Sequence, residues 1–308
     1  MRASHYPVLH SVSAPIWDTL LSSPRPARVL ARFQNAVNFV IEDQVIALVT
    51  PDIGNGPFHA VVSTLPEGDL PREVRIRREG DALHVGPWAL AMPTEPARWN
   101  PRPAWEALTL DPAALARLRT LAEAAARRDT AGSPFAALLL GDTPPALRDA
   151  ASIAALLPVV PQIAGLGPGL TPSGDDFLAG VMLGLWTKGA GQMAEGEWQA
   201  RIFEAAAPRT HRLSRAFLRA VRDGLASEPW HDLLHALSDS TRPLDPAVAR
   251  VLAFGSSSGL DMVSGAWFIL ERKLLDNFAV SKSSSNVKIN TKIMTPLKKI
   301  RKYIFLET

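Results

Sequence analysis

Apolar and polar positions divide the chain into a first part typical of β-structure and a second part typical of helices. From residue 28 to 92, short runs rich in Val, Ile, Leu and Phe alternate with turn residues. In "EVRIRREGDALHV", Val74 and Ile76 alternate with Arg75 and Arg77, and "EGD" follows as a turn, which predicts a hairpin. Three or more such strands would form a small sheet or barrel.

Helical periodicity begins at Asp111. This residue is predicted to be an N-cap, with Pro112 at the first helical position and an Ala/Leu/Arg run to Arg128. Further helical patterns follow at 133–142, 147–157, 174–188, 195–207, 211–226, 230–238, 245–252 and 260–275. The order of the elements predicts an α+β fold, in which a small N-terminal β-sheet or barrel module precedes a larger, mainly helical module.

A proline-rich connector, "PTEPARWNPRP", separates the two patterns. We therefore expect a β-rich module over residues 1–105 and a helical module over residues 106–275, in keeping with a length that suggests roughly two domains. Residues 276–308 are atypical, because lysine replaces arginine there as the usual cation. This segment is either a frameshift or fusion scar foreign to the fold, or a basic tail that contacts anionic partners.

One local pattern occurs twice in the helical part. The sequence Ser-Gly-x-Asp-x-x-x-Gly is found at residues 173–180 and again at 258–265, each time leading from a Gly/Ser-rich loop into an apolar helix. The first of these helices, "DDFLAGVMLGLW", has no polar face and is predicted to be buried. Because glycine costs a helix about 1 kcal/mol relative to alanine, we expect Gly180 and Gly265 to mark a close crossing of the two helices. Their N-termini would then line one pocket.

The predicted pocket has the chemistry of paired helix N-termini. Such ends present backbone N–H groups and a positive partial charge, which suits a phosphate or carboxylate ligand. Asp175, Asp176 and Asp261 would repel a bare anion, so we predict that they act in catalysis, by orienting a substrate amide or hydroxyl group or by binding a bridging Mg²⁺. The alternative is that these residues only cap their own helices, which is common for Ser-Gly-x-Asp at a helix start.

Residues predicted to bind ligand come from both loops and from two other segments. They are Gly167, Gly169, Thr171, Ser173, Gly174, Ser256, Ser257, Ser258, Gly259, Asn55, Gly56, Thr210 and Ser214. Asn55 and Gly56 belong to "GNGPF", which is either a turn between strands or a loop that faces the substrate. Thr210 is predicted to cap the helix that follows it, whose arginines form one stripe that is either solvated or binds an anion or a subunit. No metal ligand is assigned.

Composition narrows the class of protein. Without cysteine the chain has no disulfide, no thiol catalysis and no thiolate metal site. The net charge of +3 arises from the segment that begins at Arg272, which has nine Lys or Arg and two acids, so it does not indicate a nucleic-acid partner. The start "MRASHYPVLHSV" lacks the layout of a secretory signal, and no apolar run is long enough for a membrane span. We expect a cytoplasmic protein.

The motifs "GLGPGLTPSGDDFLAG" and "GSSSGLDMVSG" resemble a family once called a domain of unknown function and now named for the oxamate carbamoyltransferase subunit AllH. "FQNAVNF" and "GNGPF" are similar as well, and the resemblance covers about residues 8 to 272. It implies a part in allantoin breakdown, where the founding member and two partner subunits interconvert oxalurate and phosphate with oxamate and carbamoyl phosphate. One partner is an acyl-CoA-synthetase-like protein and the other is a second family member.

Two functions from different classes follow. The first is a subunit of a carbamoyltransferase-like enzyme, in which the loops hold a phosphate or carboxylate group and the aspartates orient the substrate. Catalysis would then come mainly from preorganised hydrogen-bond donors around developing charge. The alternative is a non-catalytic subunit that binds a small anion and stabilises another, catalytic protein.

Overall fold

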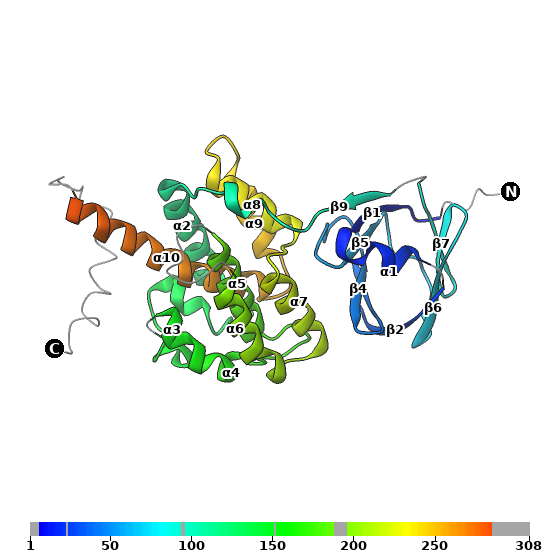
Figure 1. Ribbon diagram of the computed structural model, residues 1–308, viewed down its shortest axis with the longest axis horizontal. Coiled ribbons are helices and arrows are strands. Elements are labelled where there is room, and N and C mark those ends of the chain that lie inside the picture. Colours follow the sequence, from blue (N-terminus) through cyan, green and yellow to red (C-terminus); the bar gives the residue numbers. More distant parts are fainter. Residues whose placement is uncertain (1–5, 23, 94–95, 151, 188–195, 285–308) are drawn as a thin grey trace.

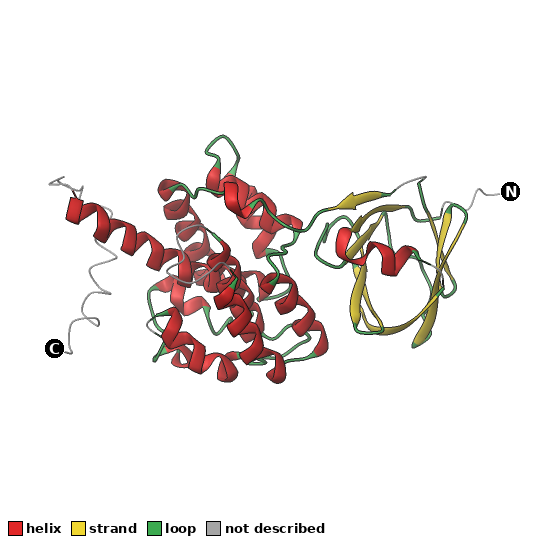
Figure 2. Ribbon diagram, viewed as in Figure 1, coloured by secondary structure: helices red, strands yellow, loops and turns green. Residues whose placement is uncertain are grey.

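The chain forms a curled β-sheet beside a helical body (Figure 1). The computed structural model describes residues 6–22, 24–93, 96–150, 152–187 and 196–284, and every structural statement below concerns these residues. All strands lie within residues 9–99, and helices dominate from residue 112 onward (Figure 2). The predicted α+β fold is confirmed.

Nine strands form one sheet that closes on itself. Their order is β8-β7-β6-β2-β3-β4-β5-β1-β9. A parallel bridge between Val8 and Ala91 joins the start of β1 to β8 and curls the sheet into a barrel-like shape. The strands are β1 (Leu9–Ser13), β2 (Arg25–Arg32), β3 (Ala36–Ile41), β4 (Gln44–Val49), β5 (His59–Val62), β6 (Glu73–Glu79), β7 (Ala82–Val85), β8 (Trp88–Ala91) and β9 (Ala97–Trp99).

The predicted hairpin is present as β6 and β7, which pair antiparallel around Gly80. This glycine has a φ of 56°, as its turn requires. β1 and β9 lie outside the region predicted to be β-structure, and the short helix α1 (Trp17–Leu21) follows β1. β1 pairs with β5, about fifty residues away. Because that pairing is tertiary, the local sequence of β1 gives little sign of it.

The helical body packs its other helices around one wholly buried helix, Ser173–Trp186. Asp111 caps α2 as predicted, since its side chain accepts hydrogen bonds from the N–H groups of Ala113 and Ala114. The helices are α2 (Pro112–Arg128), α3 (Ile153–Leu156), α4 (Val160–Ile163), α5 (Ser173–Trp186), α6 (Glu197–Ala206), α7 (Arg212–Arg222), α8 (Glu228–Ser238), α9 (Leu244–Leu252) and α10 (Ser258–Ser284).

Two predicted helices are wrong in part. The pattern at 133–142 forms the 3₁₀ helix η3 (Ala136–Leu140), which ends at Gly141 with a φ of 88°. The pattern at 147–157 gives only the single-turn helix α3, which Ser152 caps at its start and which continues into the 3₁₀ helix η5 (Leu157–Val159) with Pro158 inside it. Apolar spacing alone does not distinguish such turns from α-helix.

The predicted crossing of the two glycine-containing helices is confirmed. Every residue of α5 is buried, and α10 crosses it in the centre of the body (Figure 1). A Cβ atom added to Gly180 would lie 1.9 Å from the carbonyl oxygen of Met262, and one added to Gly265 would lie 2.0 Å from that of Phe177. The backbones therefore meet at a distance that only glycine permits on both helices.

The barrel is joined to the helical body through "GNGPF", the loop between β4 and β5. The backbone N–H and the side-chain amide of Asn55 donate to Glu228 Oε2 over 3.0 and 2.8 Å. In return, Glu228 at the start of α8 donates its N–H to the Asn55 carbonyl over 2.9 Å. The same asparagine accepts from Ser11 of β1 over 2.6 Å. This loop therefore fastens the sheet to the helices.

Asn55→Ala is expected to lower the free energy of unfolding by about 1–3 kcal/mol, because a half-buried carboxylate loses a charge-assisted hydrogen bond. Urea denaturation followed by circular dichroism measures the change. Glu204→Ala, which removes an exposed carboxylate on α6, is the matched control and should change stability by less than about 0.5 kcal/mol. Equal effects of the two substitutions would contradict the role given to Asn55.

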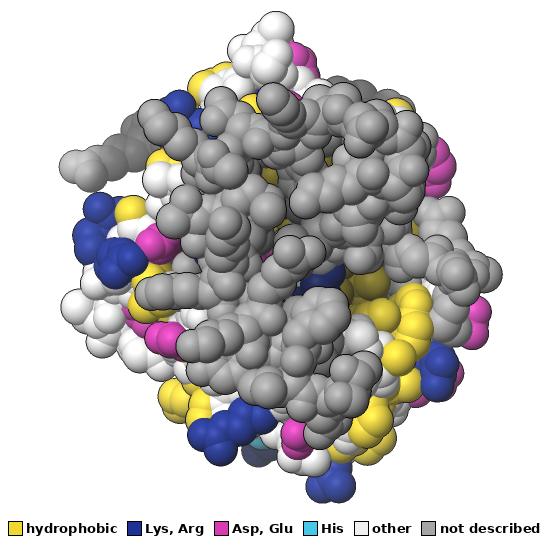
Figure 3. Space-filling view, turned by 90° about the vertical axis from the view of Figure 1, so that its left-hand side faces the viewer, with side chains coloured by type: hydrophobic (Ala, Val, Ile, Leu, Met, Phe, Trp, Pro, Cys, Tyr) yellow, Lys and Arg dark blue, Asp and Glu magenta, His cyan; other side chains and the backbone are white. Residues whose placement is uncertain are grey.

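The described surface has charges of both signs. On the face shown in Figure 3, basic and acidic side chains alternate around the rim. In the predicted arginine stripe of α7, Arg212 lies 3.7 Å from Asp43, and Arg219 and Arg222 lie over the ring of Phe203.

The atypical tail is described only as the end of α10, and residues 285–308 lie outside the described part. A search of the described residues finds no helix with the length and apolarity that crossing a membrane requires.

Candidate functional site

The glycine-rich loop before α5 is held in place by Asp175. Its carboxylate accepts from the Gly165 N–H over 2.9 Å and from the Thr210 hydroxyl. Gly165, with a φ of 75°, lies so close to the Arg209 carbonyl that a Cβ would be 2.5 Å from that oxygen. Asp175 therefore holds together the loop and the segment before α7, and its carboxylate does not line the cavity described below.

The paired pattern folds into two interlocked helix starts. Ser258 at the start of α10 lies close enough to Asp176, in the first turn of α5, to lower the pKa of its carboxyl group. Reciprocally, Ser173 at the start of α5 acts on Asp261, in the first turn of α10, in the same direction. Each aspartate thus lies beside the serine of the opposite helix, and the two N-termini lie side by side as the sequence predicts.

Asp176 and Asp261 differ in the residues that surround them. Asp261 is fully buried and accepts a hydrogen bond of 2.5 Å from Ser133, which lies just before η3. Asp176, by contrast, lines a cavity of about 370 Å³. Only one of two carboxylates that look equivalent in the sequence therefore faces open space.

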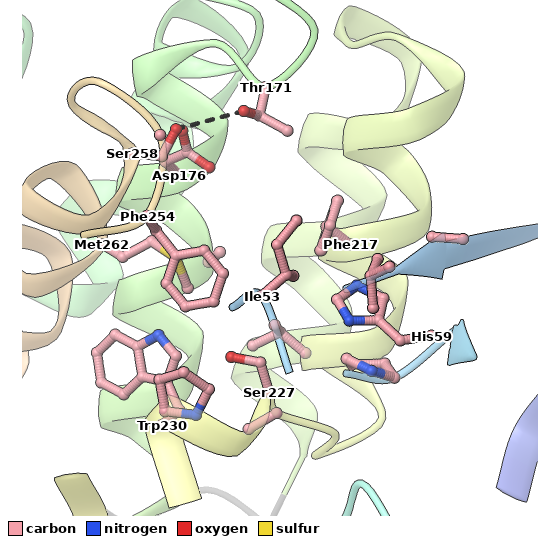
Figure 4. Close-up of a pocket in the computed structure, with 18 of the residues that line it drawn as sticks. Ile53, His59, Thr171, Asp176, Phe217, Ser227, Trp230, Phe254, Ser258 and Met262 are labelled. Carbon is pink, nitrogen blue, oxygen red and sulfur yellow. Dashed lines mark hydrogen bonds between the residues drawn. The ribbon is translucent and has the colours of Figure 1, made fainter. Parts of the chain in front are cut away.

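The cavity lies between the barrel and the helices (Figure 4). Ile53 and His59 reach it from the barrel side, and Phe217 of α7 lies beside them. Trp230 of α8, with Phe254 and Met262 on either side of the start of α10, forms the opposite wall. The fold of the whole chain is thus needed to build the cavity, and its walls are mainly apolar.

Three polar side chains gather at one end of the cavity, which we call the cavity head: Thr171, Asp176 and Ser258. The Thr171 and Ser258 hydroxyl oxygens are 3.4 Å apart (Figure 4). Asp176 Oδ2 is buried and has no hydrogen-bond partner among the described residues. A buried carboxylate oxygen without a donor is unfavourable by about 1–3 kcal/mol, so the cavity head is suited to a ligand that supplies one.

Burial raises the pKa of Asp176 to about 7, and the nearby carboxylates of Asp261 and Asp175 add to the effect. Ser258 acts in the opposite direction. Burial also raises the pKa of Asp261. A carboxyl group that gains and loses its proton near neutral pH can act as a general acid or base.

Removing the Asp176 charge is expected to change how stability depends on pH. The folded carboxyl keeps its proton up to about pH 7, whereas its ordinary pKa is 3.8. Between these values the folded state binds more protons than the unfolded state, so the stability that Asp176 contributes decreases as the pH rises from about 4 to 7. The free energy of unfolding of Asp176→Asn minus that of the wild type should therefore be about 1–4 kcal/mol larger at pH 8 than at pH 4.

Urea denaturation of both proteins at each pH measures this difference. The variant is compared with the wild type because His59 is present in both proteins and makes their stability change with pH in the opposite direction below about pH 6.5. Its lowered pKa makes its contribution decrease as the pH falls. A difference between variant and wild type that stays constant from pH 4 to 8 would contradict the raised pKa of Asp176.

His59, at the start of β5, is a buried titratable group on the barrel side of the cavity. Its Nδ1 lies 3.0 Å from the Gly54 carbonyl oxygen, which can only accept, so Nδ1 holds the ring proton and Nε2 is the acceptor. Burial lowers its pKa to about 4, against the opposing effect of that hydrogen bond. The ring packs so closely on Gly56 that a Cβ there would be 2.5 Å away. His59 is therefore a neutral hydrogen-bond acceptor at physiological pH.

Positive charge at the cavity is limited. Arg250 lines it but is ion-paired with Glu228 and Asp232. The helix N-termini are also partly occupied by their own loops. Gly174 N–H donates to the Leu166 carbonyl over 2.8 Å, and Gly259 N–H to that of Phe254 over 3.0 Å. The cavity head thus presents hydroxyls and a carboxyl group more than free backbone donors.

The structure brings three of the predicted residues to the cavity: Thr171, Asp176 and Ser258. The remaining predicted residues lie outside its lining and are Asp175, Asp261, Gly167, Gly169, Ser173, Gly174, Ser256, Ser257, Gly259, Asn55, Gly56, Thr210 and Ser214. Several of them have packing roles. A Cβ on Gly174 would lie 1.8 Å from the Ile163 oxygen, and one on Gly259 would lie 2.1 Å from that of Val251.

Thr210 and Ser214 support the glycine-rich loop through their hydroxyl groups. Thr210 is not the N-cap of α7, because the helix begins at Arg212 and the Thr210 hydroxyl donates to Asp175 instead. Ser214 donates to the Leu170 carbonyl over 3.1 Å and so supports the glycine-rich loop from below. Both hydroxyls serve the loop that shapes the cavity head.

The side chains at the cavity head are not a typical ligand set for the predicted Mg²⁺. Asp176 is the carboxylate at the cavity head, and its neighbours there are two hydroxyls, whereas Mg²⁺ prefers several anionic or carbonyl oxygens. No group of three or more His, Cys, Asp or Glu in the described part of the chain is placed to hold a metal ion.

Comparison with known protein families identifies the segment that contains the cavity head. Residues 163–270 match the family of the oxamate carbamoyltransferase subunit AllH. This AllH segment begins just before the glycine-rich loop and includes both copies of the paired pattern, so the predicted resemblance is confirmed there. The barrel residues of the cavity, His59 among them, lie outside the AllH segment. No solved structure matches the chain.

Proposed function

We propose that this chain is a subunit of a carbamoyltransferase-type enzyme and that its cavity binds the amide group of the carbamoyl acceptor. The match of residues 163–270 to the AllH family supports the reaction class. The observation that supports the site is Asp176, a buried carboxyl group that lines the cavity with one oxygen lacking a partner.

An amide fits the cavity head better than an anion does. Its NH₂ group can donate to Asp176 Oδ2, and its carbonyl can accept from the hydroxyls of Thr171 and Ser258. A carboxylate or phosphate placed there would face the Asp176 carboxylate, with Arg250 already paired to two acids. We therefore assign the acceptor amide to the cavity head and keep a phosphate or carboxylate site at the helix N-termini as the alternative.

Asp176 has a direct part in the proposed transfer. The amide nitrogen of the acceptor attacks the carbonyl carbon of carbamoyl phosphate, so a C–N bond forms and the C–O bond to phosphate breaks. The nitrogen loses one proton to the Asp176 carboxylate, and inorganic phosphate leaves with the electron pair of the broken bond. In the reverse direction Asp176 returns the proton. A carboxyl group with a pKa of about 7 is matched to both directions near neutral pH.

Reconstitution tests the proposed function. By resemblance, the partners are an acyl-CoA-synthetase-like protein and a second family member, and the pathway is allantoin catabolism. We expect carbamoyl transfer only when this chain is combined with both partners. Activity of the two partners without this chain would support the alternative, in which it is a non-catalytic anion-binding subunit.

A further inference from the structure

The cavity is larger and more apolar than a small polar acid requires. Its volume is about 370 Å³, which lies within the range of about 300–1,000 Å³ typical of sites for small organic ligands. Hydroxyl and carboxyl groups meet at the cavity head, but Ile53, Phe217, Trp230, Phe254 and Met262 form much of the remaining wall. Oxamate at the cavity head would leave most of this wall without contact.

The apolar wall includes aromatic rings on two sides. Phe254 and Phe217 lie on opposite sides of the space in Figure 4. Phe217 is supported from behind by Phe58, with ring centroids 4.5 Å apart in an edge-on arrangement. Rigid aromatic walls favour a flat apolar or aromatic body over a flexible or charged one.

The indole of Trp230 provides a second polar point, away from the cavity head (Figure 4). Trp230 is 3% exposed, and its Nε1 has no hydrogen-bond partner among the described residues. By contrast, the Nε1 groups of Trp105 and Trp186 each donate to a backbone carbonyl over 2.8 Å. Trp267 also lacks a partner but does not line the cavity. A buried indole N–H beside a cavity is suited to an acceptor on the ligand.

We propose that the cavity binds a planar aromatic or heteroaromatic carboxamide, with its amide at Asp176, its ring between Phe217 and Phe254, and an acceptor atom toward Trp230. The identity of the head group rests on the proposed carbamoyl-transfer function. The aromatic body rests independently on the volume and the walls of the cavity. A ligand of this class would give hydrogen-bond partners to two buried polar atoms, Asp176 Oδ2 and Trp230 Nε1, and would also cover the apolar wall.

Isothermal titration calorimetry on the purified full chain tests the proposal with benzamide, oxamate and inorganic phosphate as probes. Benzamide is expected to bind at least tenfold more tightly than oxamate or phosphate. Asp176→Ala and Phe217→Ala should each weaken benzamide at least fivefold. Phe33→Ala, which removes an exposed ring that does not line the cavity, is the matched control and should leave benzamide binding unchanged.

The outcomes separate this inference from the proposed function. Tighter binding of oxamate or phosphate than of benzamide, or no binding of benzamide, overturns the aromatic ligand whether or not the reconstituted complex is active. Equal weakening by Phe33→Ala and Phe217→Ala also overturns it. Selective benzamide binding by a chain that adds nothing to a reconstituted complex would support the ligand class and contradict the carbamoyltransferase role.

Discussion

Asp176→Asn is expected to lower the rate of carbamoyl transfer by the reconstituted complex at least about 100-fold, the typical contribution of a general acid or base. Asparagine keeps the shape of the side chain, but it cannot take a proton from the attacking nitrogen. The folded chain should not lose stability, because the buried charge is removed. Initial rates with carbamoyl phosphate and oxamate, together with a melting curve of the isolated chain, measure both effects.

Asp261→Asn is the matched control for this experiment. Asp261 has the same place in the paired pattern, is buried and has one unpartnered oxygen, yet Ser133 covers it and it does not line the cavity. Its replacement should change the rate by less than about fivefold, since surrounding structure and not the reacting amide contacts it. If the two variants lose activity equally, Asp176 has no special role and the proposed mechanism is wrong.

Gly180→Ala is expected to destabilise the helical body by more than about 3 kcal/mol, although alanine normally stabilises a helix relative to glycine by about 1 kcal/mol. The reason is the close crossing with α10, where the new Cβ would lie 1.9 Å from the Met262 carbonyl oxygen. The helices would have to separate, which would also displace Asp176 from Ser258. Urea denaturation gives the loss, and a reduced yield of folded protein would be its extreme form.

A graded control is available one turn further along α5. A Cβ added to Gly184 would lie 3.0 Å from the Cβ of Ile269 and 3.1 Å from the carbonyl oxygen of Ala266, contacts that a small shift of α10 can relieve. Gly184→Ala should therefore cost less than about 1.5 kcal/mol. Stability of Gly180→Ala equal to that of Gly184→Ala, or above the wild type, would show that the crossing does not hold the two helices as close as described.

The helix crossing could be predicted because its signal is local and repeated. Glycine within an apolar helix has few explanations other than a close neighbour, and the same spacing at Gly180 and Gly265 indicated which two helices meet. The hairpin of β6 and β7 and the cap at Asp111 were predictable for the same reason, since each depends on residues adjacent in the chain. The division into modules at about residue 105 follows from the same change of pattern and stays a prediction.

The apolar walls of the cavity could not be predicted, because they come from distant segments that look like ordinary core. His59 lies in an apolar strand, Trp230 occupies an apolar position of a helix, and Phe254 lies in the short connection between α9 and α10. Spacing does not show which buried side chains leave a space between them. The sequence also treated Asp176 and Asp261 alike, and only Ser133, far away in the chain, distinguishes them. Asp175, predicted as catalytic, supports the loop through hydrogen bonds that no local pattern reveals.

The most direct test of the account is a carbon-detected NMR titration of the Asp176 side-chain carboxyl group, assigned by its absence in Asp176→Asn. We expect a midpoint near pH 7 in the free chain and a shift of that midpoint when benzamide is added, because the ligand amide would contact the carboxyl group. A midpoint near pH 4 that benzamide leaves unchanged would contradict both the buried, protonatable carboxyl and its place in a ligand site.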